Sequence, residues 1–204
     1  MKISKYLSVV MLGFVLTFVL QSCRDTKASP LPVFETAVTA FADYKTIKSF
    51  AIADAAKVVP FTYRWVSIDN LNTVTKIEFF VTLYEDYVDK EGNGRTAVHG
   101  TKSFKVLEGG AVPANRAYAD VNIAASDVYT LFKDASFDYG KGDGKKPVFA
   151  QNGRTTAKQF TADDYAEVSW YITTGDGRKF TEWSPAICDG STVGANCALG
   201  FPFK

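Results

Sequence analysis

The chain has few of the side chains that usually carry catalysis or bind metals. Its 204 residues include one histidine, three cysteines and two methionines. A Ser/His/Asp or Cys/His arrangement could use only His99, and no nucleophile motif accompanies that residue. A structural zinc site needs four Cys or His ligands. We therefore expect no enzyme activity, no catalytic residue, no metal and no cofactor, and we expect His99 to lie in a surface loop.

The chain also has no large excess of charge of one sign. Lysines and arginines nearly balance the acidic residues, and the net charge is +1. Nucleic-acid binding normally needs a clustered basic surface, so no nucleic acid is expected as a partner. Aromatic residues, in contrast, are plentiful, with 16 Phe, 10 Tyr and 3 Trp. Such a composition favours β-strands.

The apolar run at the N-terminus is too short for a membrane-spanning helix. Lys2 and Lys5 supply a positive start, and Tyr6 to Leu20 follows as an apolar segment broken only by small or polar residues. A spanning helix needs roughly 20 consecutive apolar residues. A positive start, a shorter apolar run and a small-residue cleavage site are typical of a secretory signal peptide. Residues 1–22 are therefore predicted to be an export signal.

The segment Leu20-Gln21-Ser22-Cys23 resembles the bacterial lipobox. The resemblance implies that Cys23 is acylated, for example with palmitate, and becomes the first residue of a lipoprotein anchored in the outer membrane. An ordinary secretory peptide with an unrelated cysteine is the alternative. Residues 23–32 are polar with two prolines, which is typical of a flexible tether. Nothing in this tether decides between the surface and the periplasmic face of the membrane.

Two cysteines remain once Cys23 is assigned to lipid. Cys188 and Cys197 are close in sequence, and exported proteins fold in an oxidising compartment. We predict a disulfide bond between them, which would stabilise the C-terminal segment by roughly 2 to 3 kcal/mol. A metal site is the competing interpretation, and the single histidine argues against it.

Residues 33–204 are predicted to form a single domain, an immunoglobulin-like antiparallel β-sandwich with one short helix and long loops. Alternating apolar and polar residues indicate strands with one buried face, and period-two segments separated by turns are typical of sandwiches. Segments 60–67 and 76–87 are expected to pair as a central hairpin. Two smaller domains that meet near Gly142 are the alternative. The predicted strands are 33–39, 47–53, 60–67, 76–87, 103–107, 118–124, 167–172, 178–184 and 198–203, with a helix over 126–132.

Two glycine-containing loops invite ligand interpretations that their spacing does not support. Glu85 to Gly94 alternates carboxylates like a calcium loop, but the twelfth position counted from Asp89 is Gly100 rather than a carboxylate. A solvated hairpin tip is predicted there. Asp138 to Lys146 contains three glycines but does not open a helix, as a phosphate-binding loop would. We predict a mobile loop at this place.

Paired carboxylates and aromatic rings are the remaining candidates for chemistry. Asp163 and Asp164 could act as a glycosidase pair, but neighbours on a strand point to opposite faces, so solvation of a strand entry is the better interpretation. Trp183, Tyr171 and Tyr84 share faces with polar residues, where exposed flat rings could stack on sugars. Packing against the other sheet or against a loop is the alternative for each ring.

The C-terminal region resembles a group of small exported proteins. A lipobox, a β-rich body and the hairpin Thr174-Gly175-Asp176-Gly177-Arg178-x-Phe180 followed by Ser184-Pro185 resemble small outer-membrane lipoproteins of Bacteroidetes-type bacteria. Those proteins often accompany a TonB-dependent transporter and its substrate-binding lipoprotein of the starch-utilisation type. The resemblance implies an outer-membrane accessory that binds a glycan or the transporter complex, and it assigns no ligand residue.

The sequence thus favours a non-enzymatic, lipid-anchored envelope protein that helps to bind a polysaccharide or another nutrient. A structural or assembly subunit that binds another outer-membrane protein, such as the transporter and its binding lipoprotein, is the alternative. A hydrolase ranks third and would need two carboxylates facing each other in a cleft. An exposed aromatic patch would favour the first function, and an apolar or edge-strand surface would favour the second.

Overall fold

The computed structural model describes residues 37–68, 70–181 and 196–204. The signal peptide, Cys23, the tether, Trp183 and Cys188 lie outside these residues. Export, lipidation and the pairing of Cys188 with Cys197 therefore stay predictions. Thr36–Lys204 forms one compact unit of its own, which contains all the elements described below.

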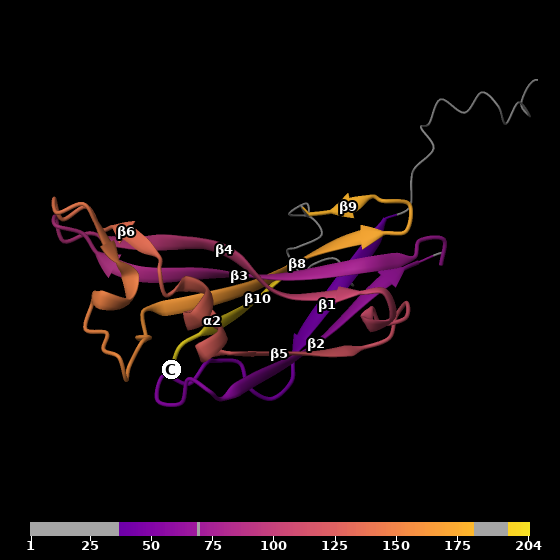
Figure 1. Ribbon diagram of the computed structural model, residues 1–204, viewed down its shortest axis with the longest axis horizontal. Helices are drawn as coiled ribbons and strands as arrows, with labels where there is room; N and C mark the ends of the chain where they lie inside the picture. Colours follow the sequence, from indigo (N-terminus) through magenta and orange to yellow (C-terminus); the bar gives the residue numbers. More distant parts are fainter. Residues whose placement is uncertain (1–36, 69, 182–195) are drawn as a thin grey trace, which may run out of the picture. The chain divides into compact units, whose positions relative to one another are not determined.

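Two antiparallel sheets form the body of this unit (Figure 1). The three-stranded sheet has the order β1-β2-β5, and the five-stranded sheet has the order β10-β8-β3-β4, with β9 paired to β8. These sheets confirm the prediction of an all-β antiparallel sandwich with one short helix. The strands are β1 (Val38–Tyr44), β2 (Val58–Ser67), β3 (Val74–Val88), β4 (Gly94–Glu108), β5 (Ala119–Ala124), β8 (Asp164–Thr174), β9 (Lys179–Phe180) and β10 (Ala198–Pro202).

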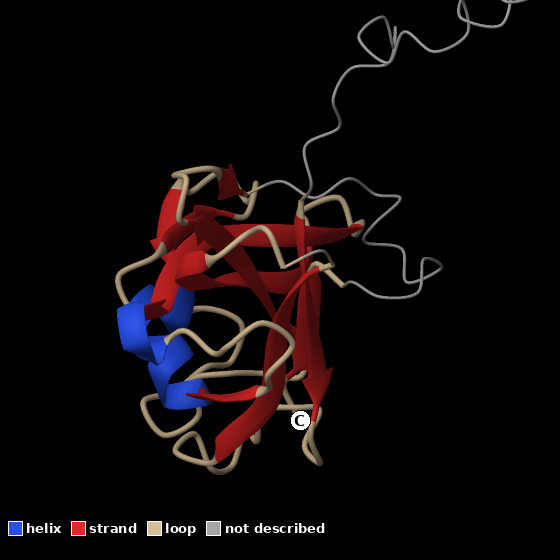
Figure 2. Cartoon of the chain, turned by 90° about the vertical axis from the view of Figure 1, so that its right-hand side faces the viewer, coloured by secondary structure: helices blue, strands red, loops and turns tan. Residues whose placement is uncertain are grey.

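In the part of the chain that the structure describes, one α-helix lies beside the two sheets (Figure 2). Helix α2 (Ala125–Phe132) contacts β3, β4 and β5, and its first turn is fixed by the Asp127 carboxylate, which accepts from the Ala124 amide at 2.8 Å. Among the described residues no helix is long and apolar enough to cross a membrane. The smaller elements are the 3₁₀ turns η1 (Gly109–Ala111) and η2 (Val148–Ala150) and the hairpin of β6 (Ser136–Asp138) with β7 (Lys145–Pro147).

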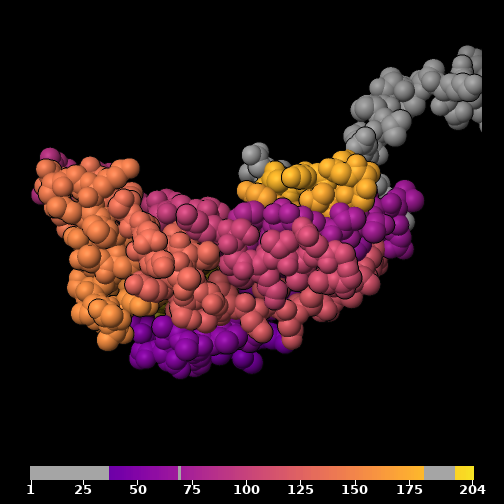
Figure 3. All heavy atoms as spheres, in the orientation of Figure 1, coloured from indigo at the N-terminus to yellow at the C-terminus, as the bar shows by residue number. Residues whose placement is uncertain are grey.

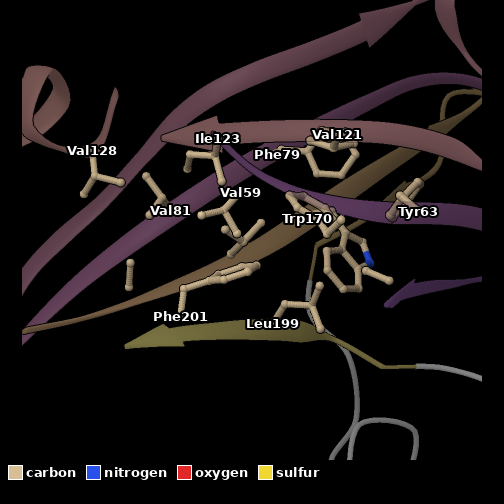
Figure 4. Packing of buried hydrophobic residues seen from close by; sticks show 14 of the residues in the cluster. Val59, Tyr63, Phe79, Val81, Val121, Ile123, Val128, Trp170, Leu199 and Phe201 are labelled. Atoms are coloured by element: carbon tan, nitrogen blue, oxygen red, sulfur yellow. The ribbon is translucent and has the colours of Figure 1, made fainter. Parts of the chain in front are cut away.

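The core lies between the sheets because each long strand alternates. On β3 the side chains of Ile77, Phe79, Val81 and Leu83 are all fully buried, as a period of two requires for a strand with one face inward. Strand β8 contributes every second residue in the same way. Figure 4 shows how these side chains, with Trp170 of β8, meet those of β2, β5, β10 and α2: Val59, Tyr63, Val121, Ile123, Val128, Leu199 and Phe201.

Three strand predictions were wrong in detail. The first strand begins at Val38 and runs on to Tyr44, and in segment 47–53 only Phe50 forms a bridge, with Phe203. The predicted hairpin of 60–67 with 76–87 does not exist, because β2 and β3 belong to different sheets. Their apolar faces pack across the core instead, with the rings of Tyr63 and Phe79 centred 4.9 Å apart. Alternating apolar residues show that one face of a strand is buried, but they do not show which strands cover that face.

Side chains join the two sheets where β1 lies near β10. The Ala42 amide donates to Asn196 Oδ1 at 2.7 Å, and Asn196 Nδ2 donates to the Ala42 carbonyl at 2.6 Å. Tyr44 Oη donates to the Gly200 carbonyl at 2.6 Å and accepts from the Gly200 amide at 3.1 Å. Strand β10 is thus an edge strand whose outer groups are satisfied, as Pro202 predicts.

Candidate functional site

Four aromatic side chains gather on the face of the five-stranded sheet that points away from the core. Phe80 and Tyr84 come from β3, and Tyr165 and Tyr171 come from β8. They occupy the positions between the buried residues of each strand, so the pleat directs them outward. We call this set of four the outer aromatic face.

The rings of the outer aromatic face form two cross-strand pairs. Phe80 and Tyr171 have ring centroids 4.4 Å apart, and Tyr84 and Tyr165 have centroids 5.9 Å apart. Phe80 and Tyr84 are four residues apart on one strand, which corresponds to about 13 Å at roughly 3.3 Å per residue. The face therefore offers two aromatic contact points at the scale of a short oligosaccharide.

Gly200 on β10 permits Tyr165 to lie across the neighbouring strand. A Cβ atom built on Gly200 would lie 1.6 Å from the Tyr165 hydroxyl oxygen and 2.4 Å from the adjacent ring carbon. The tyrosine side chain therefore occupies the space that any other residue at position 200 would fill. The Tyr165 side chain lies across β10 and remains 37% exposed.

Polar groups separate the two aromatic pairs. Glu167 lies in register with Thr82 on one side and with Gly200 on the other. Thr82 Oγ1 lies 2.8 Å from Thr101 Oγ1. Burial, followed by the Glu167 carboxylate, raises the pKa of Tyr84 and of Tyr165, so both hydroxyls keep their protons. Flat rings beside hydroxyl and carboxylate groups match the alternating apolar and polar surfaces of a sugar.

The structure describes two of the three sequence-predicted ligand residues, Tyr84 and Tyr171. Tyr84 and Tyr171 share their sheet face with polar residues, as expected, and the structure shows that they lie on the same face. Each packs on a ring that the sequence pattern did not indicate, Tyr165 and Phe80 respectively. Tyr165 precedes the predicted strand 167–172 and so lay outside it. Trp183 lies outside the described residues. Extending the period-two pattern back to Asp164 could have found Tyr165.

A second polar group of side chains is buried at one end of the core. Glu85 and Asp164 continue the inward-facing rows of β3 and β8 and lie directly opposite each other. Two carboxylates facing each other would repel. Arg154 separates them: its Nη1 donates to Glu85 Oε1 at 2.7 Å, and its Nη2 donates to Asp164 Oδ1. The side chains of all three residues are at most 1% exposed.

Glu85 accepts from three further groups, and we call the six residues the buried ionic cluster: Glu85, His99, Tyr139, Asn152, Arg154 and Asp164. Tyr139 Oη lies 2.6 Å and His99 Nε2 lies 3.0 Å from Glu85 Oε2, and Asn152 Nδ2 donates to Oε1. Burial alone would raise the pKa of Glu85, but these hydrogen bonds and that from Arg154 hold it at about 2. Burial raises the pKa of Asp164, and Arg154 opposes that rise.

Two sequence predictions are corrected by this cluster. His99 lies in β4 with a fully buried side chain rather than in a surface loop, and its ring packs on Phe137 with centroids 5.5 Å apart. Asp164 is buried rather than solvated. The glycine segment after Asp138 forms the exposed turn of the β6–β7 hairpin, next to buried Tyr139, and its mobility stays a prediction. The alternation of residues along a strand does not show that a distant segment, here residues 139–154, supplies the partners of its buried charges.

A polar cleft of about 760 Å³ lies beside the cluster. It is lined by the base of the β3–β4 hairpin, by Lys141, by Asn152 and by Asp163. Of the buried ionic cluster only Asn152 lines it, so the paired carboxylates do not face the cleft and could not act on a bound substrate there. The cluster joins the segment around residues 139–154 to the sheet, which is a structural role.

At the tip of the β3–β4 hairpin, the Asp89 carboxylate accepts hydrogen bonds from neighbouring groups of the hairpin itself. Asp89 accepts from the amides of Glu91 and Asn93, each at 2.9 Å, and from Arg95 Nε at 3.0 Å. These bonds, that from the Asn93 amide foremost, lower the pKa of Asp89 to about 2. Within the described ranges, no group of three or more His, Cys, Asp or Glu side chains could hold a metal ion.

Two tyrosine hydroxyls allow a matched test of the core. Among the described residues Tyr63 Oη is buried and has no hydrogen-bond partner, whereas Tyr139 Oη donates to Glu85. We expect Tyr63→Phe to raise the free energy of unfolding by about 1 kcal/mol, since an unsatisfied buried group is removed, and Tyr139→Phe to lower it by about 2 kcal/mol. Urea denaturation of both variants measures this. Equal effects of the same sign would contradict the described environments.

Comparison with known proteins gives matches among solved structures. No family model matches the chain, and no curated protein matches it. Among solved structures, the fold is similar to the crystal structure of a DUF4466 family protein from Parabacteroides merdae, with 11% sequence identity and a TM-score of 0.34. The similarity covers 74% of this chain and 44% of that chain. The chain thus spans less than half the length of that protein.

Proposed function

We propose that this protein is a non-enzymatic, lipid-anchored envelope protein that binds a glycan through its outer aromatic face. Cys23 carries the lipid, and the sandwich domain presents the face on the outer membrane. The observation that carries the proposal is the arrangement of the two ring pairs, which lie on one sheet face with polar groups between them. Aromatic faces stack on the apolar sides of sugar rings, and the carboxylate and hydroxyl groups bond the sugar hydroxyls.

Two short elements lie at opposite ends of the five-stranded sheet. Strand β9 pairs with the end of β8, and the β6–β7 hairpin lies near β4 at the other end of the sheet. Figure 3 shows the orange β6–β7 region and the yellow-orange β9 region at opposite ends, with the strands β3 and β4 between them. An extended polymer could therefore lie across the sheet.

The test compares binding of polysaccharides to the native protein and to tyrosine variants. Affinity electrophoresis through gels that contain a panel of soluble polysaccharides identifies a retarding glycan. We expect Tyr84→Ala and Tyr171→Ala each to weaken binding about tenfold or more, because a binding-site aromatic contributes about 1 to 2 kcal/mol or more.

Tyr118→Ala is the matched control, since Tyr118 is 58% exposed and lies outside the outer aromatic face. Its binding should equal that of the native protein. Failure of every glycan to retard the protein would refute the proposal. It would then favour the alternative, an accessory subunit that binds another outer-membrane protein, which a pulldown from solubilised outer membrane would test.

A further inference from the structure

The charges on the outer aromatic face are predominantly negative. Glu167 lies between the two ring pairs, and Glu78 lies in register with Tyr171. Lys76 is the neighbouring cation, but its Nζ is shared by Glu78 at 3.0 Å and Glu108 at 3.3 Å. The carboxylate of Glu167 has no such cation among the described residues that surround it in the sheet.

We infer that the outer aromatic face selects uncharged glycans and rejects acidic ones, with Glu167 as the residue that determines this specificity. This inference rests on the proposed function of the same face. A carboxylate is an acceptor only, so Glu167 can bond the hydroxyl groups of a neutral sugar. A uronate or sulfate group placed between the two ring pairs would face Glu167 at short range, whereas Lys76 is already shared by Glu78 and Glu108 and Lys179 lies at the far end of the sheet, in register with Thr173.

The hydroxyls beside Glu167 strengthen this argument. The Tyr84 hydroxyl lies on this face, and its pKa is raised first by burial and then by the nearby Glu167 carboxylate. The Thr82 and Thr101 hydroxyls bond each other. The face thus combines aromatic surface with free acceptor capacity, which suits hydroxyl-rich neutral polymers.

The experiment uses chemically matched pairs of polymers with the full lipoprotein in detergent. Dextran, starch and hydroxyethylcellulose are each compared with the carboxymethylated form of the same backbone by affinity electrophoresis at low and at high salt. We expect at least tenfold weaker binding of the carboxymethylated partner at low salt. The difference should shrink at high salt, because exposed charges are then screened.

Glu167→Gln provides the specificity readout. This variant keeps the size of the side chain, removes its charge and should reduce the discrimination between the paired polymers by at least fivefold, because the carboxymethylated polymer should bind it more tightly than it binds the native protein. Glu91→Gln is the matched control, because the Glu91 side chain is 61% exposed at the hairpin tip away from this face.

The outcomes separate this inference from the proposed function. If no neutral polymer binds, the proposed function itself fails. If a neutral polymer binds but its carboxymethylated form binds equally well or better, the proposed function stands and the inference is overturned. Unchanged discrimination in Glu167→Gln would also overturn the assignment of Glu167, since a charge elsewhere would then cause the selectivity.

Discussion

Replacing Arg154 with methionine should lower the free energy of unfolding by about 3 to 5 kcal/mol at pH 7, the usual cost of removing one partner from a buried ionic group. Methionine keeps a long side chain in place of the guanidinium but leaves Glu85 and Asp164 facing each other without a cation. Both native carboxylates bond this one guanidinium, and all three side chains are almost completely buried. Urea denaturation of the variant and the native protein measures the loss.

The pH dependence of stability should differ between this variant and the native protein. In the native protein the folded-state pKa of Glu85 is about 2, below its usual 4.5. Ionised Glu85 therefore stabilises the fold above about pH 4.5, and this stabilisation, of about 3 kcal/mol, disappears as the pH falls toward 2. The raised pKa of Asp164 acts in the opposite direction, because proton uptake by a carboxyl whose folded-state pKa is raised favours the folded state.

Without Arg154 two buried carboxylates cannot both ionise readily, so the pKa of at least one should rise. The Arg154→Met variant should then become more stable, not less, as the pH falls from 7 toward 5. Lys141→Met is a suitable control, because Lys141 lines the cleft and, among the described residues, takes no part in the ion pairs of the cluster. A native-like pH profile in Arg154→Met would mean that the guanidinium does not link the two carboxylates.

Replacing Gly200 with alanine should weaken glycan binding about tenfold although residue 200 presents no functional group. The added Cβ would lie 1.6 Å from the Tyr165 hydroxyl, so the tyrosine side chain must leave its place across β10. The far end of this side chain can move, so we expect a loss of stability of about 1 kcal/mol, at the lower end of the range for overpacking. Loss of binding with nearly native stability is the expected signature.

Gly94→Ala is the matched control for this variant. Gly94 also lies in a strand, and a Cβ built there meets nothing within 4 Å. Isothermal titration with the glycan found by electrophoresis compares the two alanine variants, and Tyr165→Ala should reproduce the effect of Gly200→Ala. Native affinity in Gly200→Ala would show that the position of Tyr165 across β10 does not matter for the ligand.

The sandwich itself could be predicted because its signal is local. Alternation of apolar residues in β2, β3 and β8 marks one buried face on each strand, and the Gly175-Asp176-Gly177 turn follows β8 as expected. The apparent hairpin of 60–67 with 76–87 shows the limit of that signal. Neighbours in sequence usually pair, but alternation is equally satisfied by two strands that face each other across a core.

The buried ionic cluster could not be predicted for a related reason. Glu85 stands next to an acidic hairpin, and its position on the strand resembles a solvated tip. Its partners His99, Tyr139 and Arg154 come from separate segments of the chain. A charged residue at an inward position of a strand can be predicted to be buried only if the residue that neutralises its charge is known. Tertiary packing alone brings that residue near.

The sequence by itself determined the strand-rich fold and the outward positions of Tyr84 and Tyr171, because the period of two is a property of the strand backbone. The predicted export signal and lipidation of Cys23 also rest on the sequence alone. Only the tertiary structure decided that Phe80 and Tyr165 complete two ring pairs, that Gly200 admits Tyr165, and that Arg154 joins two opposed carboxylates. Each of these depends on which strands lie side by side, and long-range pairing places residues together that no local pattern connects.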